Sequence, residues 1–400
     1  MIGYRSDIDG LRAIAVLAVI AYHFKLSFPL LGYATGGYIG VDVFFVISGY
    51  VITQLLKQPF RLADFYERRV RRILPALLTV MFACFPLAFV FMLPKAAGEY
   101  GRSVLAALFS VSNIYFLRED SYTAEPSLLK PFLHSWSLGV EEQFYLLFPL
   151  LMLFLKRYFP RYIGRCLLLL FAASLLLAHG ISLEHRDAAF YLLPTRAWEL
   201  LAGALLAMHG GHRPHRQFRW IMWPALLAMA ASFFLFDSST QHPSLLTVIP
   251  VGATMLLIYG LRPSDRLAGL LACRPMTFIG RRSYSLYLWH FPVLAFARII
   301  APAEAERYAL GLLALTALLS ALSYRYVEQP FRDRQRVSCQ RLTLSVLVAV
   351  LMVAAGHLYL IAQQGGANSS RRFDISRRAQ LSGGAATRRL LPVPFPKDRR

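Results

Sequence analysis

The feature that most constrains this chain is a succession of long apolar segments joined by short connections rich in arginine and lysine. A helix needs about 20 mostly apolar residues to cross the roughly 30 Å hydrocarbon core of a bilayer. Eleven segments meet that requirement, near residues 11–28, 38–56, 73–93, 137–156, 165–182, 193–209, 219–236, 244–261, 283–300, 307–325 and 342–363. The sequence therefore predicts an all-α integral membrane protein with about 10 core transmembrane helices plus an eleventh.

The apolar stretch 101–117 differs from these segments because several polar residues interrupt it. They are Ser103, Ser110, Ser112 and Asn113. Counting this stretch as a span would disturb the alternation of basic and non-basic loops that membrane proteins follow. We therefore expect an interfacial or re-entrant helix here.

The basic residues indicate membrane orientation rather than nucleic-acid binding. Hydrophobic residues make up 56% of the chain and charged residues 16%, whereas soluble domains carry about 25% charged residues. The formal charge of +21 comes mainly from clusters in alternate loops, beginning with 57–72. Such loops face the cytoplasm, so the chain is predicted to be a multi-pass protein of a bacterial inner membrane, with a cytoplasmic N-terminus and no nucleic-acid partner.

Several familiar catalytic and metal-binding patterns are missing from the sequence. The four cysteines form no close pair, and no HExxH, GxxxxGK[ST] or GxSxG motif occurs. We therefore expect no metal site and no bound cofactor. Any chemistry would depend on histidines, arginines and carboxylates within the membrane segments.

The first apolar segment carries Arg12 and His23, eleven residues apart. Eleven residues make three helical turns plus about 20°, so both side chains share one face and stand roughly 16 Å apart along the axis. A cation near the membrane surface and an imidazole deeper in the membrane suit an anionic ligand whose reactive end enters the membrane. Snorkelling by Arg12 and a structural role for His23 are the alternatives.

Carboxylates and a run of arginines supply further candidates. Asp42 begins the second segment and could orient a histidine, line a polar cavity or lie at the interface. Glu141 and Glu142 open the fourth segment; one can favour the helix dipole, but the other must turn towards the bundle. The arginines of the loop before the third segment either orient the chain or clamp phosphates, namely Arg68, Arg69, Arg71 and Arg72.

Three other ionisable residues lie inside apolar segments. Arg196 and Glu199 are spaced for an i,i+3 pair, and we prefer that structural interpretation. His290 lies roughly 10 Å inside the ninth segment, if that helix begins near residue 283. It is a candidate site residue or a structural histidine.

Six segments together resemble the acyltransferase family 3 membrane proteins. The first is Tyr4–Ala13 with His23, which resembles the R-x10-H signature of that family. The other five follow in order as Gly40–Tyr50, the Phe65–Arg72 Arg-rich loop, Trp136–Tyr145, Ser283–Pro292 and Tyr324–Arg332. The resemblance covers roughly residues 1–335.

This resemblance implies transfer of an acyl group from cytoplasmic acyl-CoA, usually acetyl-CoA as co-substrate, to an extracytoplasmic carbohydrate such as lipopolysaccharide O-antigen or exopolysaccharide. Arg12 and the arginines of 68–72 would hold the CoA phosphates. His23 would be the general base or would take the acyl group itself. Asp42 and Glu141 complete the expected catalytic set, and supporting roles are expected for Asp9, Glu142, Tyr287 and His290.

The predicted domains are a transmembrane acyltransferase-like domain over 1–335, an additional helix over 336–363, and a basic, disordered tail over 364–400. Family members with an eleventh span commonly attach an outer SGNH hydrolase-like domain, but only about 37 residues follow the span here. We therefore expect either a separate SGNH-type periplasmic partner or a shortened encoded protein. The alternatives are an acyl conduit for such a partner and a proton-coupled transporter, although no convincing internal repeat supports the latter.

Overall fold

The computed structural model describes residues 4–29, 31–119, 125–209, 220–302 and 304–363, and the predicted tail over 364–400 lies outside them. Within these ranges the chain is helical except for turns and one antiparallel hairpin of two short strands, β1 (Ser27–Phe28) and β2 (Gly32–Tyr33). The prediction of an all-α architecture is therefore confirmed for the described residues.

The α-helices follow the apolar segments, and their bounds are α1 Ser6–His23, α2 Gly40–Lys57, α3 Leu62–Phe91, α4 Pro94–Leu108, α5 Ser112–Glu119, α6 Ser135–Tyr158, α7 Ile163–Glu184, α8 Arg186–Tyr191, α9 Leu193–His209, α10 Met222–Leu235, α11 Val248–Gly260, α12 Arg266–Leu271, α13 Arg274–Arg281, α14 Ser283–Ile300, α15 Ala309–Ser323, α16 Gln329–Arg332 and α17 Cys339–Ala362. Short 3₁₀ turns occur at η1 Gly37–Ile39, η2 Glu125–Leu129 and η4 Leu245–Thr247. The segment η5, Tyr324–Glu328, is a π-helical turn.

Within the described ranges, six helical segments are long and apolar enough to cross a membrane: Gly37–Lys57, Leu62–Phe91, Ser135–Tyr158, Ile163–Glu184, Ala309–Arg332 and Cys339–Ala362. Two shorter apolar segments, Met222–Leu235 and Leu245–Gly260, accompany them. The chain is therefore a multi-pass membrane protein. The expected total of ten or eleven crossings depends on the shorter helices, and it stays a prediction.

Two segments differ locally from the sequence-based expectation. The stretch 101–117 is not one helix: α4 ends at Leu108, α5 begins at Ser112, and Ser110 between them has a left-handed φ of 58°. The Arg-rich segment before the third span was expected to be a loop, but α3 already begins at Leu62. Arginine is a good helix former, and the amphipathic start of α3 continues directly into its apolar part.

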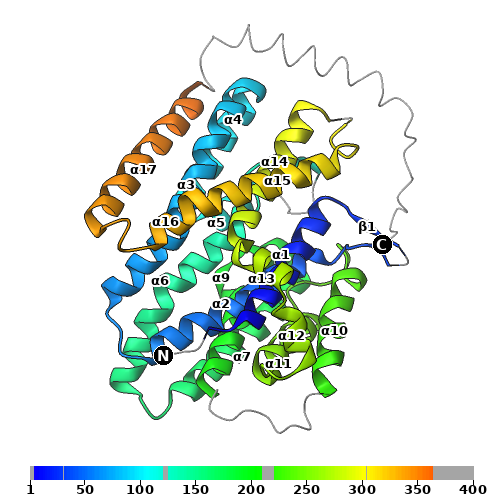
Figure 1. The fold of residues 1–400 in the computed structure, drawn as a ribbon, viewed down its shortest axis with the longest axis vertical. Helices are drawn as coiled ribbons and strands as arrows, with labels where there is room; N and C mark the ends of the chain where they lie inside the picture. The colour runs from blue at the N-terminus through cyan, green and yellow to red at the C-terminus, as the bar shows by residue number, and fades with distance from the viewer. Residues whose placement is uncertain (1–3, 30, 120–124, 210–219, 303, 364–400) are drawn as a thin grey trace.

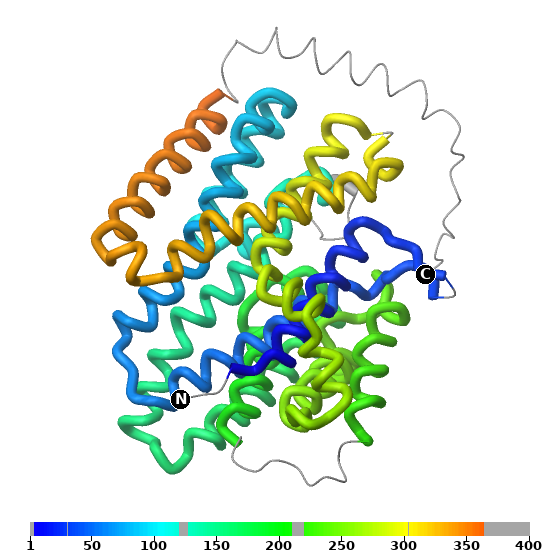
Figure 2. Tube along the Cα trace, viewed as in Figure 1, coloured from blue at the N-terminus to red at the C-terminus, as the bar shows by residue number. Residues whose placement is uncertain are grey.

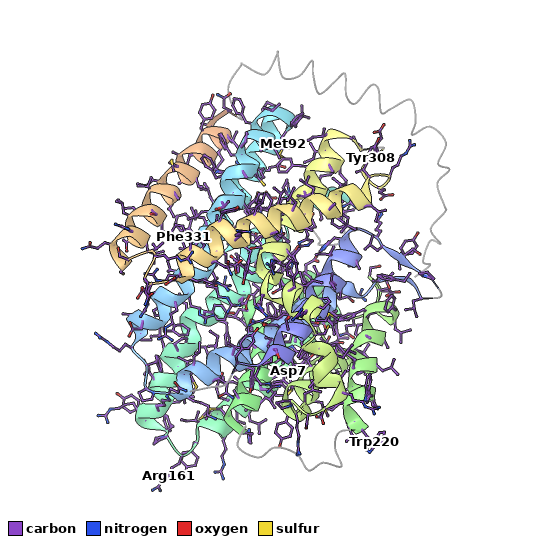
Figure 3. The ribbon with its side chains drawn as sticks, viewed as in Figure 1. Asp7, Met92, Arg161, Trp220, Tyr308 and Phe331 are labelled. Atoms are coloured by element: carbon purple, nitrogen blue, oxygen red, sulfur yellow. The ribbon has the colours of Figure 1, made fainter. Side chains whose placement is uncertain are left out.

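Helix α1 lies across the middle of the molecule, where α2, α13 and α14 pack against it (Figure 1, Figure 2). Helix α9 packs along α2 and α7, and α17 packs along α4 and α3 at one side of the bundle. Figure 3 shows Met92 and Tyr308 near one end of the bundle and Arg161 and Trp220 at the other. The division at residue 335 into a core domain and an additional helix stays a prediction.

The α2–α9 crossing requires glycine on both helices. A Cβ atom at Gly49 would lie 1.8 Å from the carbonyl oxygen of Leu200, and one at Gly203 would lie 2.0 Å from that of Val46. Small residues allow membrane helices to approach this closely. The polar residues that α2 and α9 contribute to the bundle are brought together by this crossing.

We expect Gly203→Ala to destabilise the protein by about 1–3 kcal/mol, because the added methyl group forces the two backbones apart. The matched control is Gly311→Ala, since a Cβ atom at Gly311 meets nothing within 4 Å. Alanine is the better helix former, so the control should be neutral or stabilising. Thermal unfolding in detergent measures both variants, and equal Tm values would contradict the assigned crossing.

Candidate active site

A basic cavity of about 590 Å³ opens between the first turns of α1, the start of α3 and the α13–α14 junction. Seven arginines line it, with a single carboxylate, Asp9, among the lining residues. The arginines are Arg12, Arg68, Arg71, Arg72, Arg281, Arg332 and Arg334. Guanidinium groups bind phosphates in bidentate fashion, so the cavity is suited to a ligand that carries several phosphates.

The five arginines predicted to bind acyl-CoA do not all face this cavity in the same way. Arg12, Arg68 and Arg72 line it. Arg71 also lines it, but it is buried and donates to Glu67, at 2.8 Å, and to the carbonyl oxygens of Phe331 and Val337. Arg69 lines a different cavity beside the α2–α3 connection. Side-chain direction on α3 separates these neighbours, since positions 100° apart face different elements.

A smaller cavity of about 70 Å³ continues the basic one towards the centre of the bundle. The two cavities share Arg12, Arg72, Ser283 and Tyr284. The inner cavity is otherwise lined by Val41, Phe44, Phe45, Ser48, Ser137, Leu138, Glu141 and Tyr287. A wide polar mouth thus narrows into a slot with mixed apolar and hydroxyl walls.

Glu141 and Glu142 lie inside α6 rather than in its first turn, which holds no acidic residue, so the interpretation that one of them favours the helix dipole is wrong. Glu141 lines the inner cavity and accepts hydrogen bonds from Ser48 and Tyr145. Glu142 does not line it, and its Oε1 is buried without a hydrogen-bond partner among the described residues. At the basic mouth, Asp9 accepts from Tyr4 and lies 3.5 Å from Arg12. Asp9 therefore orients Arg12, one of the two arginines that the cavities share.

His23 and His290 meet next to the inner cavity. His23 is the last residue of α1, and its Nδ1 lies 3.2 Å from Nε2 of His290 on α14. Both rings are buried. Tyr287, one turn before His290, lines the cavity and donates to the His134 carbonyl oxygen at 2.8 Å. The structure therefore brings three predicted residues together, although His23 lies at the end of its helix rather than within it.

The hydrogen bonds of His23 and His290 determine which ring nitrogen of each histidine carries the proton. Nδ1 of His290 lies 2.6 Å from the Tyr287 carbonyl oxygen, which can only accept, so this nitrogen carries the proton in the neutral ring. Nε2 of His290 then accepts from Nδ1–H of His23. This tautomer places the basic lone pair of His23 on Nε2. The imidazole is thus held in the form that a general base or nucleophile requires.

Two residues at this site were missed by sequence reasoning. The His134 ring centroid lies 5.6 Å from that of His290, and neither of its ring nitrogens has a hydrogen-bond partner among the described residues. Arg298 donates to the His23 carbonyl oxygen at 3.3 Å, where a cation favours the C-terminus of α1. Two features of the sequence could have identified them. His134 lies directly before the Ser135–Tyr145 segment, and Arg298 is a charged residue inside an apolar helix.

Asp42 belongs to a separate buried cluster. Arg196 Nη2 donates to its Oδ1 at 2.5 Å, and Arg196 Nη1 lies 3.1 Å from Glu199 Oε1. The expected pairing of Arg196 with Glu199 is therefore present, with Asp42 as a further partner. The basic partners of Asp42 in this cluster are Arg196 and His242. Of the alternatives for Asp42, orienting a histidine fits this placement, because its Oδ1 lies 3.6 Å from Nε2 of His242.

His242, in the loop before η4, completes the cluster. Burial and the neighbouring Arg196 cation lower the pKa of His242 well below its usual range. The neutral ring accepts from Arg196 Nη1 at 2.8 Å through Nε2, and its Nδ1 lies 3.1 Å from the Thr247 hydroxyl. One arginine is thus shared by a histidine and two carboxylates.

The π-helical turn η5 shapes one wall of the basic cavity. Tyr324 at its start and Arg332 on α16 both line the cavity. The fully buried Glu328 pairs with Arg332 and accepts from the Ser285 hydroxyl at 2.6 Å. π-helical turns occur frequently at functional sites. Here the turn attaches the end of α15 to the first turn of α14, the helix that carries His290.

Comparison with known proteins agrees with this arrangement. Residues 5–326 match the model of an acyltransferase domain, acyltransferase family 3. O-acetyltransferase OatA of Staphylococcus aureus strain NCTC 8325 is 31% identical over 368 residues, which cover 83% of this chain and 58% of OatA. OatA of strain MRSA252 gives the same identity and coverage, 31%, 83% and 58%.

The chain thus spans less than two thirds of the length of these relatives, 58% in both cases. No solved structure matches it significantly. The family match nevertheless extends over most of the chain, from α1 into η5, and includes the inner cavity, the histidine pair and most residues that line the basic cavity. This multi-pass membrane protein belongs to the acyltransferase family 3.

Proposed function

We propose that the chain is a membrane O-acetyltransferase that moves an acetyl group from cytoplasmic acetyl-CoA to a hydroxyl of a cell-envelope carbohydrate. One observation carries this proposal: the arginine-lined cavity continues into a narrow slot that reaches Tyr287, beside the His23–His290 pair. Membership of the acyltransferase family supports acyl transfer as the reaction. The name of the similar OatA proteins supports an oxygen acceptor and an acetyl group.

The donor would bind with its phosphates in the basic cavity and its thioester in the slot. A volume of about 590 Å³ lies within the roughly 300–1,000 Å³ typical of ligand pockets. Arg12 and Arg72 line both cavities, so they would bind the donor at the junction between its phosphates and its uncharged chain. The inner walls of Phe44, Ser137 and Tyr287 suit an uncharged chain that carries amide groups.

At the histidine pair, Nε2 of His23 would take the proton of the acceptor hydroxyl as its oxygen attacks the thioester carbonyl carbon. The new C–O bond forms, the C–S bond breaks, and the imidazolium returns the proton to the leaving thiolate. His290 would hold the ring and share the positive charge through the 3.2 Å contact. In the alternative sequence, Nε2 itself first takes the acetyl group and then passes it to the hydroxyl.

The acceptor would be lipopolysaccharide O-antigen or an exopolysaccharide on the outer side of a bacterial inner membrane. This side follows from the loop charges, which favour a cytoplasmic N-terminus and therefore a cytoplasmic basic cavity. The His23 end of α1 then lies further from the cytoplasm than Arg12. An SGNH-type partner would be needed only if the chain delivers the acetyl group without transferring it to sugar.

Transfer by the purified chain tests the proposal. The chain is reconstituted in vesicles with radiolabelled acetyl-CoA and envelope glycan, and ester-linked label is measured. We expect label in the glycan, released by mild base. Bound acetyl-CoA without glycan label would indicate a conduit for a separate enzyme. Absence of acetyl-CoA binding would contradict the assignment of acetyl-CoA as the donor and would favour the transporter alternative.

A lining arginine outside the predicted set tests the donor cavity separately. Arg281 is exposed and has no ion pair among the described residues. Hydrogen bonds to charged groups contribute about 1.5–3 kcal/mol, so Arg281→Gln should weaken acetyl-CoA binding by about tenfold or more. Isothermal titration measures the affinity, with Arg161→Gln as an exposed control outside the cavity. Equal affinities for the two variants would contradict the assigned phosphate site.

A further inference from the structure

A third cavity, of about 390 Å³, lies at the connection between α2 and α3. It shares only Arg68 with the basic donor cavity. Its lining residues are Leu55, Gln58, Pro59, Phe60, Arg61, Asp64, Phe65, Arg68 and Arg69. The cavity therefore combines three cations with an apolar and aromatic wall at the end of two membrane helices.

Arg69 is the unusual member of this lining. Its side chain is 9% exposed, and its Nε is buried without a hydrogen-bond partner among the described residues. Its guanidinium carbon lies 5.6 Å from the Phe65 ring centroid and 5.4 Å from that of Tyr145. Aromatic faces hold the cation in place but supply no countercharge. Glu141 and Glu142 of α6 act electrostatically on Arg69, but no ion pair joins either of them to it among the described residues. The buried guanidinium therefore still favours an anion in the adjoining cavity.

The surrounding charges also favour an anion. Arg61 and Arg68 line the cavity beside Arg69, and Lys156 Nζ lies 5.4 Å from the Phe60 ring centroid. The one lining carboxylate, Asp64, lies 3.5 Å from Arg334 and is partly neutralised by it. Among the residues that line the cavity, three arginines therefore stand against one carboxylate.

We propose that this cavity binds the phosphate headgroup of an anionic phospholipid. The phosphate lies between Arg61 and Arg69, and the glycerol and first acyl carbons contact Phe60 and Phe65. Basic pockets at the ends of transmembrane helices recognise anionic headgroups in this way. The donor cavity provides a separate place for a nucleotide, so the proposal does not depend on the acetyl-transfer function.

Native mass spectrometry of the detergent-purified full chain tests this proposal, with phosphatidylglycerol as the probe and phosphatidylcholine as the uncharged comparison. Wild type should bind one phosphatidylglycerol. The variant Arg61→Gln/Arg69→Gln should bind it about 30-fold more weakly, and Arg61→Gln alone about fivefold more weakly. Arg161→Gln at the α6–α7 connection should bind as wild type does, because Arg161 is an exposed cation outside the cavity.

Two results would overturn the proposal. Equal phosphatidylglycerol affinity in wild type and Arg61→Gln, which removes an exposed side chain and leaves the buried Arg69 intact, would show that the cavity does not hold the lipid. Displacement of the lipid by adenosine 3′,5′-bisphosphate would assign the cavity to the donor nucleotide instead. Arg69→Lys keeps the charge and should retain binding, and thermal unfolding verifies that each variant is folded.

Discussion

Replacing His23 with alanine is expected to lower the rate of acetyl transfer by about 10²–10⁴-fold, the range that general acid–base catalysis contributes. The physical reason is the loss of the only base that the His290 contact holds with its lone pair on Nε2. Acetyl-CoA binding should remain near the wild-type value, because His23 does not line the basic cavity. Initial rates of label transfer and equilibrium binding measure the two effects separately.

The matched control for this variant is His185→Ala. His185 is exposed at the end of α7, so its loss should change neither transfer nor the amount of protein in the membrane. The transfer rate of His290→Ala should fall between those of His23→Ala and His185→Ala, because His290 orients His23 and does not itself touch the acceptor in the proposed reaction. A His23→Ala protein that transfers acetyl within about threefold of the wild-type rate would remove His23 from the chemistry.

The largest expected loss of stability follows from Arg196→Met. Arg196 is buried, pairs with Asp42 and Glu199, and lies under the rings of Phe45 and Trp136 at 5.4 and 5.6 Å. Removing one partner of a buried ion pair costs about 3–5 kcal/mol, because it leaves an uncompensated charge. We expect a large fall in Tm, or loss of folded protein, when unfolding is followed in detergent.

A triple variant separates charge from packing in the same cluster. Arg196→Met combined with Asp42→Asn and Glu199→Gln removes all three charges and approximately preserves side-chain volume. Neutralising a whole buried cluster is often nearly neutral or stabilising, so the triple variant should recover most of the lost stability. An Arg196→Met protein as stable as wild type would contradict the importance of this ion-pair cluster for stability.

The apolar segments predicted the helices well because a hydrophobic run in a chain of this kind has few other structures available. Helix starts were less predictable. The run of arginines at 68–72 was expected to lie in a loop, yet α3 includes it from Leu62 onwards. Charge marks the membrane boundary, whereas helix formation depends on backbone hydrogen bonding, which continues past that boundary.

Side-chain contacts of the candidate site were predictable where both partners lie on one helix. They were less predictable where the partners lie on different helices. The i,i+3 spacing predicted the Arg196–Glu199 pair. The shared face of Arg12 and His23 stays a prediction; Arg12 lines the basic cavity, and His23 contacts His290. The contact of Asp42 with Arg196 joins positions 154 residues apart, and that of His23 with His290 joins positions 267 apart. Only the packing of α2 on α9 and of α1 on α14 determines such contacts.

In the proposed reaction the donor enters at the basic cavity, and the acetyl group leaves at the opposite side of the membrane, past the histidine pair. Sealed inside-out vesicles, loaded with envelope glycan and supplied externally with radiolabelled acetyl-CoA, test it most directly. We expect label in the enclosed glycan, protected from an added esterase until detergent opens the vesicles, and none in right-side-out vesicles. Label that appears only on glycan outside the inside-out vesicles would contradict transfer across the bundle.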